Sequence, residues 1–220
     1  MSPIDNMSSP DKNPFKAFLY ELFFYEIPFH EISFYMKPSI NIQQGWLSSA
    51  RRVPSPNMNT RPVDTPISLL VIHNISLPPE QFENGYIEQF FINQLDATVH
   101  PYFAEIAEMT VSAHLLITRT GEVIQFVPFD QRAWHAGRSC FRGRDNCNDF
   151  SVGIELEGAD TIAYTDEQYT VLAQVSSCLM EEYPAIMLDT IVGHSDIAPG
   201  RKTDPGESFD WPRFQQLLKQ

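Results

Sequence analysis

The chain has 220 residues, of which 43% are hydrophobic and 20% are charged, as is typical of one globular domain with appendages rather than a disordered or fibrous chain. Its formal net charge of -13 repels polyanions, so we expect no nucleic-acid partner. No apolar run reaches the roughly 18 uncharged residues of a membrane-spanning helix, and no signal peptide is apparent. These observations predict a cytoplasmic protein without membrane association.

Cysteine usage agrees with that location. The chain has three cysteines, Cys140, Cys147 and Cys178, an odd number without CxxC spacing. This pattern fits neither a disulfide framework nor a zinc ribbon, so we expect reduced thiols.

The first 35 residues differ from the rest of the chain, because they hold nine of its 27 aromatic residues. Neither strand alternation nor a helical stripe is visible there, and Pro14 and Pro28 interrupt the segment. Three interpretations stay open: a partner-binding segment, an aromatic strand pair packed on the domain, or an upstream extension from a mis-assigned start. We therefore divide the chain into an extension, residues 1–35, and a domain, residues 36–220.

From residue 46 onward the order of apolar segments and turn residues predicts a mixed α/β domain. Residues 67–73, ISLLVIH, form an apolar run of buried-strand length that ends on a histidine. A capping box at Thr165 and Gln168 predicts the start of a long helix. The other expected elements are helices at 82–95, 102–109 and 211–219, a hairpin of strands 113–118 and 122–127, a long loop at 128–150, and strands 151–156 and 190–194.

Two histidines and one aspartate suggest a metal site. His73 and His194 each end a predicted strand, and loops at strand ends converge on ligands in open sheets. Asp204 follows ten residues after His194 in the proline-constrained loop DIAPGRKTDPG. Two imidazoles and one carboxylate are a catalytic zinc set, because three protein ligands leave the fourth tetrahedral position open. Each histidine taken singly is more often a structural residue.

Two further residues suit hydrolysis at such a site. Glu155 lies inside the apolar strand SVGIEL, where a carboxylate is costly to bury unless it is paired or functional, so it is a candidate general base. The alternative is a strand glutamate that faces solvent. Lys202 could stabilise a tetrahedral oxyanion, and its alternative is an ordinary solvated lysine.

Several long segments together resemble one known family. They are GWLSSARRVPSPN, LLVIHNISLPP, HPYFAEIA, VSAHLLITRTGEVIQFVPFDQRAWHAG, CNDFSVGIELEG and GHSDIAPGRKTDPG. They are similar to the AmpD-type amidases of the zinc N-acetylmuramoyl-L-alanine amidase superfamily, over about residues 45–218. The resemblance implies an α/β fold, a single domain with a central mixed β-sheet flanked by helices.

The resemblance also implies a site and an activity. It places one Zn²⁺ per chain on His73, His194 and Asp204, the catalytic roles on Glu155 and Lys202, and makes His114 a core or supporting histidine rather than a ligand. We assign substrate contacts to a further set of three residues, Asn74, Trp134 and Arg201. The implied reaction hydrolyses the amide between the lactyl group of 1,6-anhydro-N-acetylmuramic acid and L-alanine in muropeptides, during cytoplasmic peptidoglycan recycling. A small muropeptide is then the expected partner, and a monomer the expected state.

Two alternative functions remain open. A non-catalytic peptidoglycan-binding module would be expected to lack a metal ligand, whereas all three are present. An exported N-acetylmuramoyl-L-alanine amidase that acts on polymeric peptidoglycan would be expected to carry a signal peptide and, in many cases, disulfides.

Deletion of the extension tests the proposed division. A chain that starts at Met36 should keep its zinc content and kcat, because every predicted ligand and catalytic group lies at or after His73. If three of the aromatics packed on the domain, each would contribute about 1.5–3 kcal/mol. A much lower melting temperature, or an inactive Met36 form, would show that the extension belongs to the fold.

Overall fold

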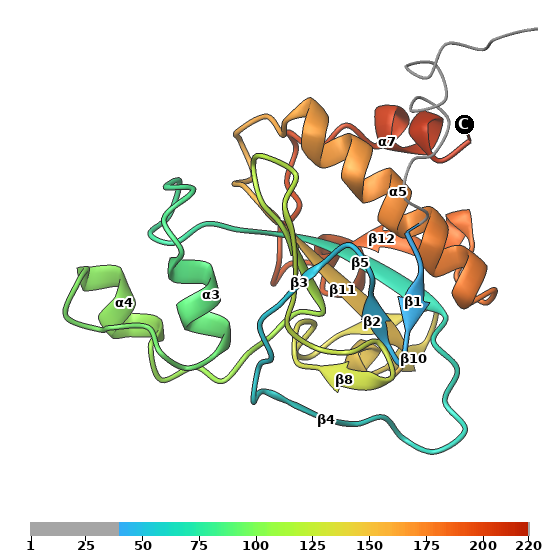
Figure 1. The fold of residues 1–220 in the computed structure, drawn as a ribbon, viewed down its shortest axis with the longest axis horizontal. Coiled ribbons are helices and arrows are strands. Elements are labelled where there is room, and N and C mark those ends of the chain that lie inside the picture. Colours follow the sequence, from blue (N-terminus) through green and yellow to red (C-terminus); the bar gives the residue numbers. More distant parts are fainter. Residues whose placement is uncertain (1–39, 220) are drawn as a thin grey trace, which may run out of the picture. The chain divides into compact units, whose positions relative to one another are not determined.

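Residues 40–219 are described by a computed structural model (Figure 1). The aromatic extension and the predicted boundary at residue 36 lie outside this range. The described domain contains a six-stranded sheet in the order β12-β5-β11-β6-β7-β3. The pairs β12·β5, β5·β11, β11·β6 and β7·β3 are parallel and β6·β7 is antiparallel. The predicted fold class, an α/β domain with a central mixed sheet, is confirmed.

The strands of the large sheet are β3 (Arg51–Arg52), β5 (Leu69–Ile75), β6 (Leu115–Ile117), β7 (Val123–Gln125), β11 (Ser151–Glu157) and β12 (Ile191–Gly193). Three two-stranded sheets join β1 (Ile42–Gln43) to β2 (Trp46–Leu47), β4 (Met58–Thr60) to β8 (Gln131–Ala133), and β9 (Cys140–Phe141) to β10 (Arg144–Asp145). The helices are α3 (Tyr86–Phe91), α4 (Pro101–Ile106), η1 (Cys147–Asp149), α5 (Asp166–Glu182), η2 (Leu188–Thr190), α6 (His194–Ile197) and α7 (Trp211–Leu217).

Most predicted elements occur near their expected positions. The capping box at Thr165 is present and opens α5, and β6 and β7 form the expected hairpin. The expected helices 82–95 and 102–109 are shorter, six residues each. The region 128–150 is not a plain loop, because it contains β8, the β9–β10 hairpin and η1.

The two histidines do not end their strands as predicted. β5 continues two residues beyond His73, because β11 pairs with it as far as Ile75. β12 ends one residue before His194, which is the first residue of α6. The chain turns there because the Asp196 side chain accepts a hydrogen bond from the Gly193 backbone N–H at 2.7 Å and so caps the helix.

The central strands are buried on both faces, and side chains alternate between two different layers. On one face, residues such as Ile72 and Ile154 pack against Leu172 and Leu179 of α5 in the largest core cluster, which α7 completes through Phe214. On the opposite face a second core cluster contains Leu116 of β6 together with phenylalanines of α3 and α4. Figure 1 shows α5 and α7 on one side of the sheet and α3 and α4 away from them.

Alternation also separates the polar residues of the sheet from its apolar ones. Ser151, Gly153, Glu155 and Glu157 occupy every second position of β11, between the residues that pack on α5. They therefore all face away from that helix. His73 occupies the corresponding face of β5, because it pairs with Glu155 in register. No helix among the described residues is long and apolar enough to cross a membrane.

A buried arginine ties region 128–150 to the rest of the domain. Arg61, which follows β4, is 8% exposed. Its guanidinium donates hydrogen bonds to four backbone carbonyls, those of Phe129, Asn148, Asp149 and Ser151, over distances of 2.8–3.1 Å. Burial lowers the pKa of Arg61 to about 10, so the side chain stays charged at neutral pH. One side chain thus satisfies carbonyls that would otherwise be buried without donors.

Loss of this guanidinium should destabilise the domain. Arg61→Met keeps the apolar stem but leaves several buried carbonyls unpaired, so we expect the free energy of unfolding to fall by about 2–4 kcal/mol in urea denaturation. Arg138→Met removes an exposed guanidinium and is the matched control, with an expected change within about 0.5 kcal/mol. Equal denaturation midpoints for the two variants would contradict the assigned role of Arg61.

Candidate metal centre and active site

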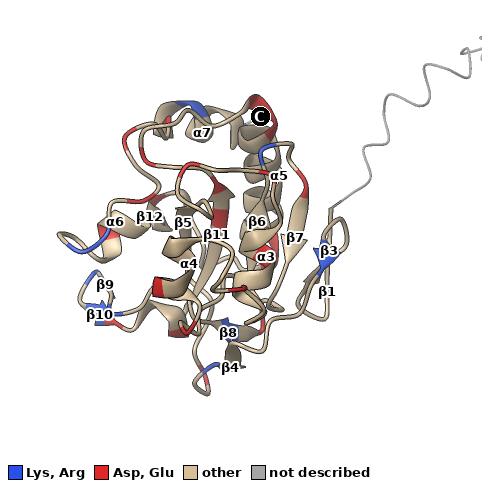
Figure 2. Cartoon of the chain, turned by 90° about the vertical axis from the view of Figure 1, so that its left-hand side faces the viewer, with Lys and Arg blue, Asp and Glu red and all other residues tan. Residues whose placement is uncertain are grey.

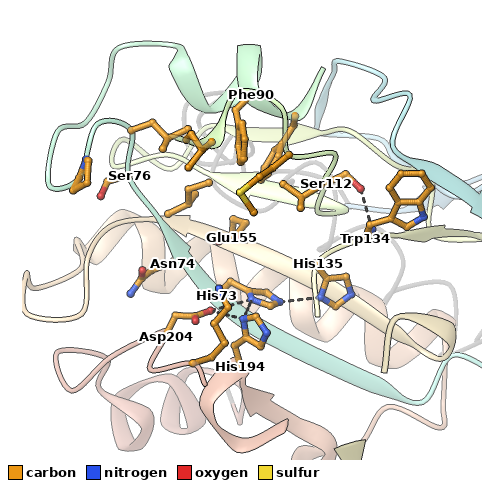
Figure 3. Close-up of a pocket in the computed structure, with 18 of the residues that line it drawn as sticks. His73, Asn74, Ser76, Phe90, Ser112, Trp134, His135, Glu155, His194 and Asp204 are labelled. Carbon is orange, nitrogen blue, oxygen red and sulfur yellow. Dashed lines mark hydrogen bonds and ion pairs between the residues drawn. The ribbon is translucent and has the colours of Figure 1, made fainter. Parts of the chain in front are cut away.

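The three predicted metal-site residues meet at one end of the large sheet (Figure 3). β12 and β5 are parallel with Gly193 opposite Ile72, so the next residues on each strand path are His194 and His73. Asp204 reaches both from the loop after α6. The His73 Nδ1, His194 Nδ1 and Asp204 Oδ2 atoms are each 3.0 Å from the other two. This is a compact, buried triangle of two nitrogens and one oxygen.

The triangle suits one tetrahedral metal ion. Zinc binds histidine nitrogens and carboxylate oxygens at about 2.0–2.2 Å, which places two tetrahedral ligand atoms roughly 3.3 Å apart. The observed separations of 3.0 Å are close to that value. Three such ligands leave one position for a water molecule or substrate, as catalytic zinc sites require. The donor set therefore fits a catalytic metal ion.

The protonation states of His73 and Asp204 also fit metal binding. Burial lowers the pKa of His73 to about 4, although Asp204 opposes the shift. Burial raises the pKa of Asp204, but contacts with His194 and His73 outweigh it and hold the pKa below its usual range. At neutral pH the site thus offers a neutral imidazole and an ionised carboxylate, the forms in which these groups bind metals.

Glu155 lies directly beside this group and does not face solvent. It pairs with His73 in the β5·β11 register, it is 9% exposed, and its Oε2 atom has no hydrogen-bond partner among the described residues. Burial raises the pKa of Glu155 well above its usual range, the nearby Asp204 carboxylate raises it further, and Lys202 opposes both. A buried carboxyl without a partner and with a raised pKa is typical of a catalytic acid or base.

These groups open into one cavity of about 350 Å³. Its polar end holds the metal-binding triangle, Glu155 and Lys202, and its other end is apolar. Figure 3 shows the apolar side chains, among them Phe90, across the cavity from the histidines. The apolar lining comes from α3, α4 and the segments beside them: Leu77, Pro79, Phe90, Phe91, Tyr102, Ile106, Met109 and Val111. The cavity can therefore bind a ligand with an apolar body and one reacting polar group.

The predicted substrate-contacting residues fall into two groups. Asn74 and Trp134 line the cavity; the Asn74 amide donates to Asp160 at 2.8 Å and the Trp134 indole to Asn59 at 2.7 Å. Arg201 does not line it. Its guanidinium donates instead to two backbone carbonyls behind the metal group, those of Ala136 and Arg138, at 2.8 and 2.7 Å. The structure thus gives no support for a substrate contact by Arg201.

Sequence analysis did not single out His135, which the structure places against His73, with 2.9 Å between His135 Nδ1 and His73 Nε2. A signal was available in the glycine inside the buried strand β11, because a strand glycine often marks a close approach. A Cβ at Gly153 would lie 2.5 Å from the His135 ring. His114 is buried outside the metal group. Its Nδ1 accepts a hydrogen bond from the Gly153 N–H at 3.0 Å, so the expectation that it is a core histidine is confirmed.

Charged side chains are unevenly distributed around the site. Figure 2 shows acidic residues across most of the domain and basic residues at several places, among them β3, β8 and α7, with one group around β9, β10 and the loop after α6. That loop also carries Lys202 and Asp204. In a chain of net charge -13, this local cluster favours approach of an anionic ligand near the metal group.

Comparisons with known proteins match this architecture. The sequence model of the N-acetylmuramoyl-L-alanine amidase family matches residues 63–207. The 1,6-anhydro-N-acetylmuramyl-L-alanine amidase AmpD of Salmonella typhimurium is 59% identical over 175 residues, which cover 80% of this chain and 93% of the relative. The AmpD of Escherichia coli is 58% identical over 177 residues, 80% of this chain and 96% of the relative. A crystal structure of a selenomethionine AmpD derivative superposes with a TM-score of 0.79 at 58% identity, covering 80% of this chain and 98% of the other.

The extent of these matches shows the class of protein. The chain belongs to the N-acetylmuramoyl-L-alanine amidase family, whose members are amide hydrolases. The relatives named above, each similar over 80% of this chain, are AmpD amidases.

Proposed function

We propose that this chain hydrolyses the amide bond between the lactyl group of 1,6-anhydro-N-acetylmuramic acid and L-alanine in muropeptides. One observation carries the proposal: a buried His-His-Asp triangle lies beside a buried carboxyl group without a hydrogen-bond partner, at the polar end of a cavity. The names of the AmpD relatives supply the substrate. The lining of the cavity agrees with it, because the C–H groups of a sugar ring can pack on apolar and aromatic side chains while the lactyl amide lies at the polar end.

We assign one Zn²⁺ per chain to His73, His194 and Asp204. When bound, zinc supplies Lewis-acid chemistry that polarises a carbonyl oxygen and makes a water molecule more acidic. The three residues hold the ion from β5, the start of α6 and the loop after it. β12, which leads directly into α6, is the neighbour of β5 in the sheet. The pairing of these two strands therefore sets the positions of His73 and His194.

Glu155 is assigned as the general base and then the general acid. Its carboxylate removes a proton from the attacking water and returns that proton to the amide nitrogen as the amine leaves. The raised pKa of Glu155 supports this assignment, because a carboxylate with a high proton affinity is a stronger base. The apolar surroundings of the strand maintain that affinity.

Lys202 is assigned to the oxyanion. It lines the cavity together with Glu155 and the metal-binding residues, so its ammonium can stabilise the negative charge that develops on the carbonyl oxygen. Asn74 and Trp134 also line the cavity and are proposed to position the substrate. Sequence analysis gave Arg201 the same role, and we now propose that it supports the loop behind His194.

The resemblance to AmpD-type amidases also suggests a biological setting. We propose that the chain acts as a monomer on small muropeptides in the cytoplasm, in peptidoglycan recycling. An exported amidase that acts on polymeric peptidoglycan is less well supported, because relatives matched over 93% and 96% of their own length are named for the 1,6-anhydro substrate.

Zinc content tests the metal assignment. Elemental analysis should find one zinc per wild-type chain, and a chelator should abolish hydrolysis of anhydro-muropeptide until Zn²⁺ is added back. His73→Ala should lose zinc and activity together, because the two remaining ligands, His194 and Asp204, are too few to hold the ion. His100→Ala removes a histidine that caps α4 and should retain both. Active wild-type protein without zinc would refute the assignment.

Substitution of Glu155 tests the base. Glu155→Gln keeps the size of the side chain but cannot take up the proton, so kcat should fall by roughly 10²–10⁴-fold while one zinc per chain is retained. Glu157→Gln is the matched control, since this second buried glutamate lies two residues further along the same face of β11 and should leave kcat unchanged. Loss of zinc from Glu155→Gln would instead place Glu155 among the ligands.

A further inference from the structure

Both proposed histidine ligands use their Nδ1 atoms, and both have a partner for the opposite nitrogen. His194 Nε2 lies 3.1 Å from the Ala136 carbonyl oxygen. Arg201 Nη2 lies further from His194 Nε2, at 3.5 Å, and donates at shorter distances to the Ala136 and Arg138 carbonyls. Because a carbonyl can only accept, the closer contact places the His194 proton on Nε2, and Nδ1 presents a lone pair. His73 Nε2 lies 2.9 Å from His135 Nδ1. Two imidazole nitrogens can share only one proton, so the state of His73 depends on that of His135.

The next contacts determine the proton position on His135. Its Nε2 atom lies 3.1 Å from Ser151 Oγ, and Ser151 Oγ donates to the Cys147 carbonyl at 2.6 Å. Because the single hydroxyl proton points to the carbonyl, Ser151 Oγ must accept from His135 Nε2–H. With that proton on Nε2, the neutral imidazole of His135 presents Nδ1 as an acceptor toward His73 Nε2.

The chain of hydrogen bonds therefore leads back to the metal group. His135 Nδ1 can only accept, so His73 must donate from Nε2, and His73 Nδ1 is left with a lone pair directed at the metal position. Resting on the proposed function, we infer that His135 and Ser151 are positioning residues that hold His73 in the tautomer able to bind zinc. The Cys147 carbonyl is the acceptor that orders the whole chain.

The surrounding structure holds this chain in place. The Asn148 side-chain oxygen accepts hydrogen bonds from two successive backbone N–H groups, those of His135 and Ala136, at 3.1 and 2.8 Å. One side chain thus positions the partners of both histidine ligands. Gly153 leaves the space that the His135 ring occupies, since a Cβ there would lie 2.5 Å from the ring. His73 and His135 meet edge to face with 5.0 Å between ring centroids.

Zinc affinity of the full-length chain, measured by competition with a chelator, tests the inference. His135→Leu removes the acceptor, and we expect the dissociation constant for Zn²⁺ to rise about 10–100-fold, the usual effect of losing a residue that orients a metal ligand. His135→Asn retains an oxygen near the Nδ1 position and should restore most of the affinity. An unchanged affinity in His135→Leu would overturn the inference.

Ser151→Ala tests the outer link with little risk to folding, because only a hydroxyl is lost and the Ser151 carbonyl still binds Arg61. Without the hydroxyl, His135 can move its proton to Nδ1, which forces the His73 proton onto the metal side. We expect a measurable rise in the zinc dissociation constant, smaller than in His135→Leu. Ser176→Ala is the matched control, since Ser176 Oγ is buried without a hydrogen-bond partner among the described residues, and its affinity should equal that of wild type. Equal affinities for Ser151→Ala and Ser176→Ala would overturn the role of Ser151.

Histidine ¹⁵N NMR gives a readout that a purely structural role would not change. In wild type, two-bond ¹H–¹⁵N correlations should show His73 and His135 protonated at Nε2. In zinc-free Ser151→Ala, an Nδ1–H tautomer of His135 should become populated. A wild-type His135 protonated at Nδ1 would overturn the inference.

The same measurements separate this inference from the proposed function. If wild type binds zinc and hydrolyses anhydro-muropeptide while His135→Leu keeps wild-type zinc affinity, the inference alone is wrong. A wild-type chain that binds no zinc would overturn the proposed function and this inference together.

Discussion

The parallel pairing of β5 with β11, which sets Glu155 opposite His73, is the contact from which the rest of the site is built. Side chains alternate between the faces of a strand, so this register turns His73, Ser151, Gly153 and Glu155 toward the same side. Their neighbours along each strand pack under α5. The core that stabilises the sheet thus also fixes the site, because a slip of one residue would exchange the two sets.

Burial of so many polar groups at one end of a sheet has a thermodynamic consequence. Two imidazole nitrogens and a carboxylate oxygen approach to 3.0 Å, and with the protons on the far nitrogens all three present lone pairs. Such an arrangement is repulsive unless a cation lies between them. Metal binding and stability of the fold are then coupled, because the unfolded chain does not preserve the site.

Region 128–150 contacts the two histidines of the metal group and supplies none of the proposed reacting groups. It carries His135 and Ala136, which lie beside the Nε2 atoms of the two proposed histidine ligands, His73 and His194. Its own position depends on Arg61, which binds carbonyls at both ends of the region, and on the Asn148 side chain. A long segment with little regular structure can therefore fix the orientation of His73 and His194, since its own polar backbone groups are paired with buried side chains.

The class of the domain, the buried central strands, the start of α5 and the members of the candidate metal set could all be predicted from the sequence alone. Each of these depends on local signals: apolar runs, a capping box, and histidines and an aspartate near the ends of elements. Only the folded structure shows the contact of His135 with His73, the cavity lined by α3 and α4, and the hydrogen bonds of Arg201 to backbone carbonyls. These features depend on contacts between residues distant along the chain, such as His135 beside His73 and Gly153, and no local pattern specifies which distant partner a side chain meets. Hydrogen-bond directions add a second reason, because the tautomer of a histidine is set by its acceptor, here a carbonyl brought close only by the fold.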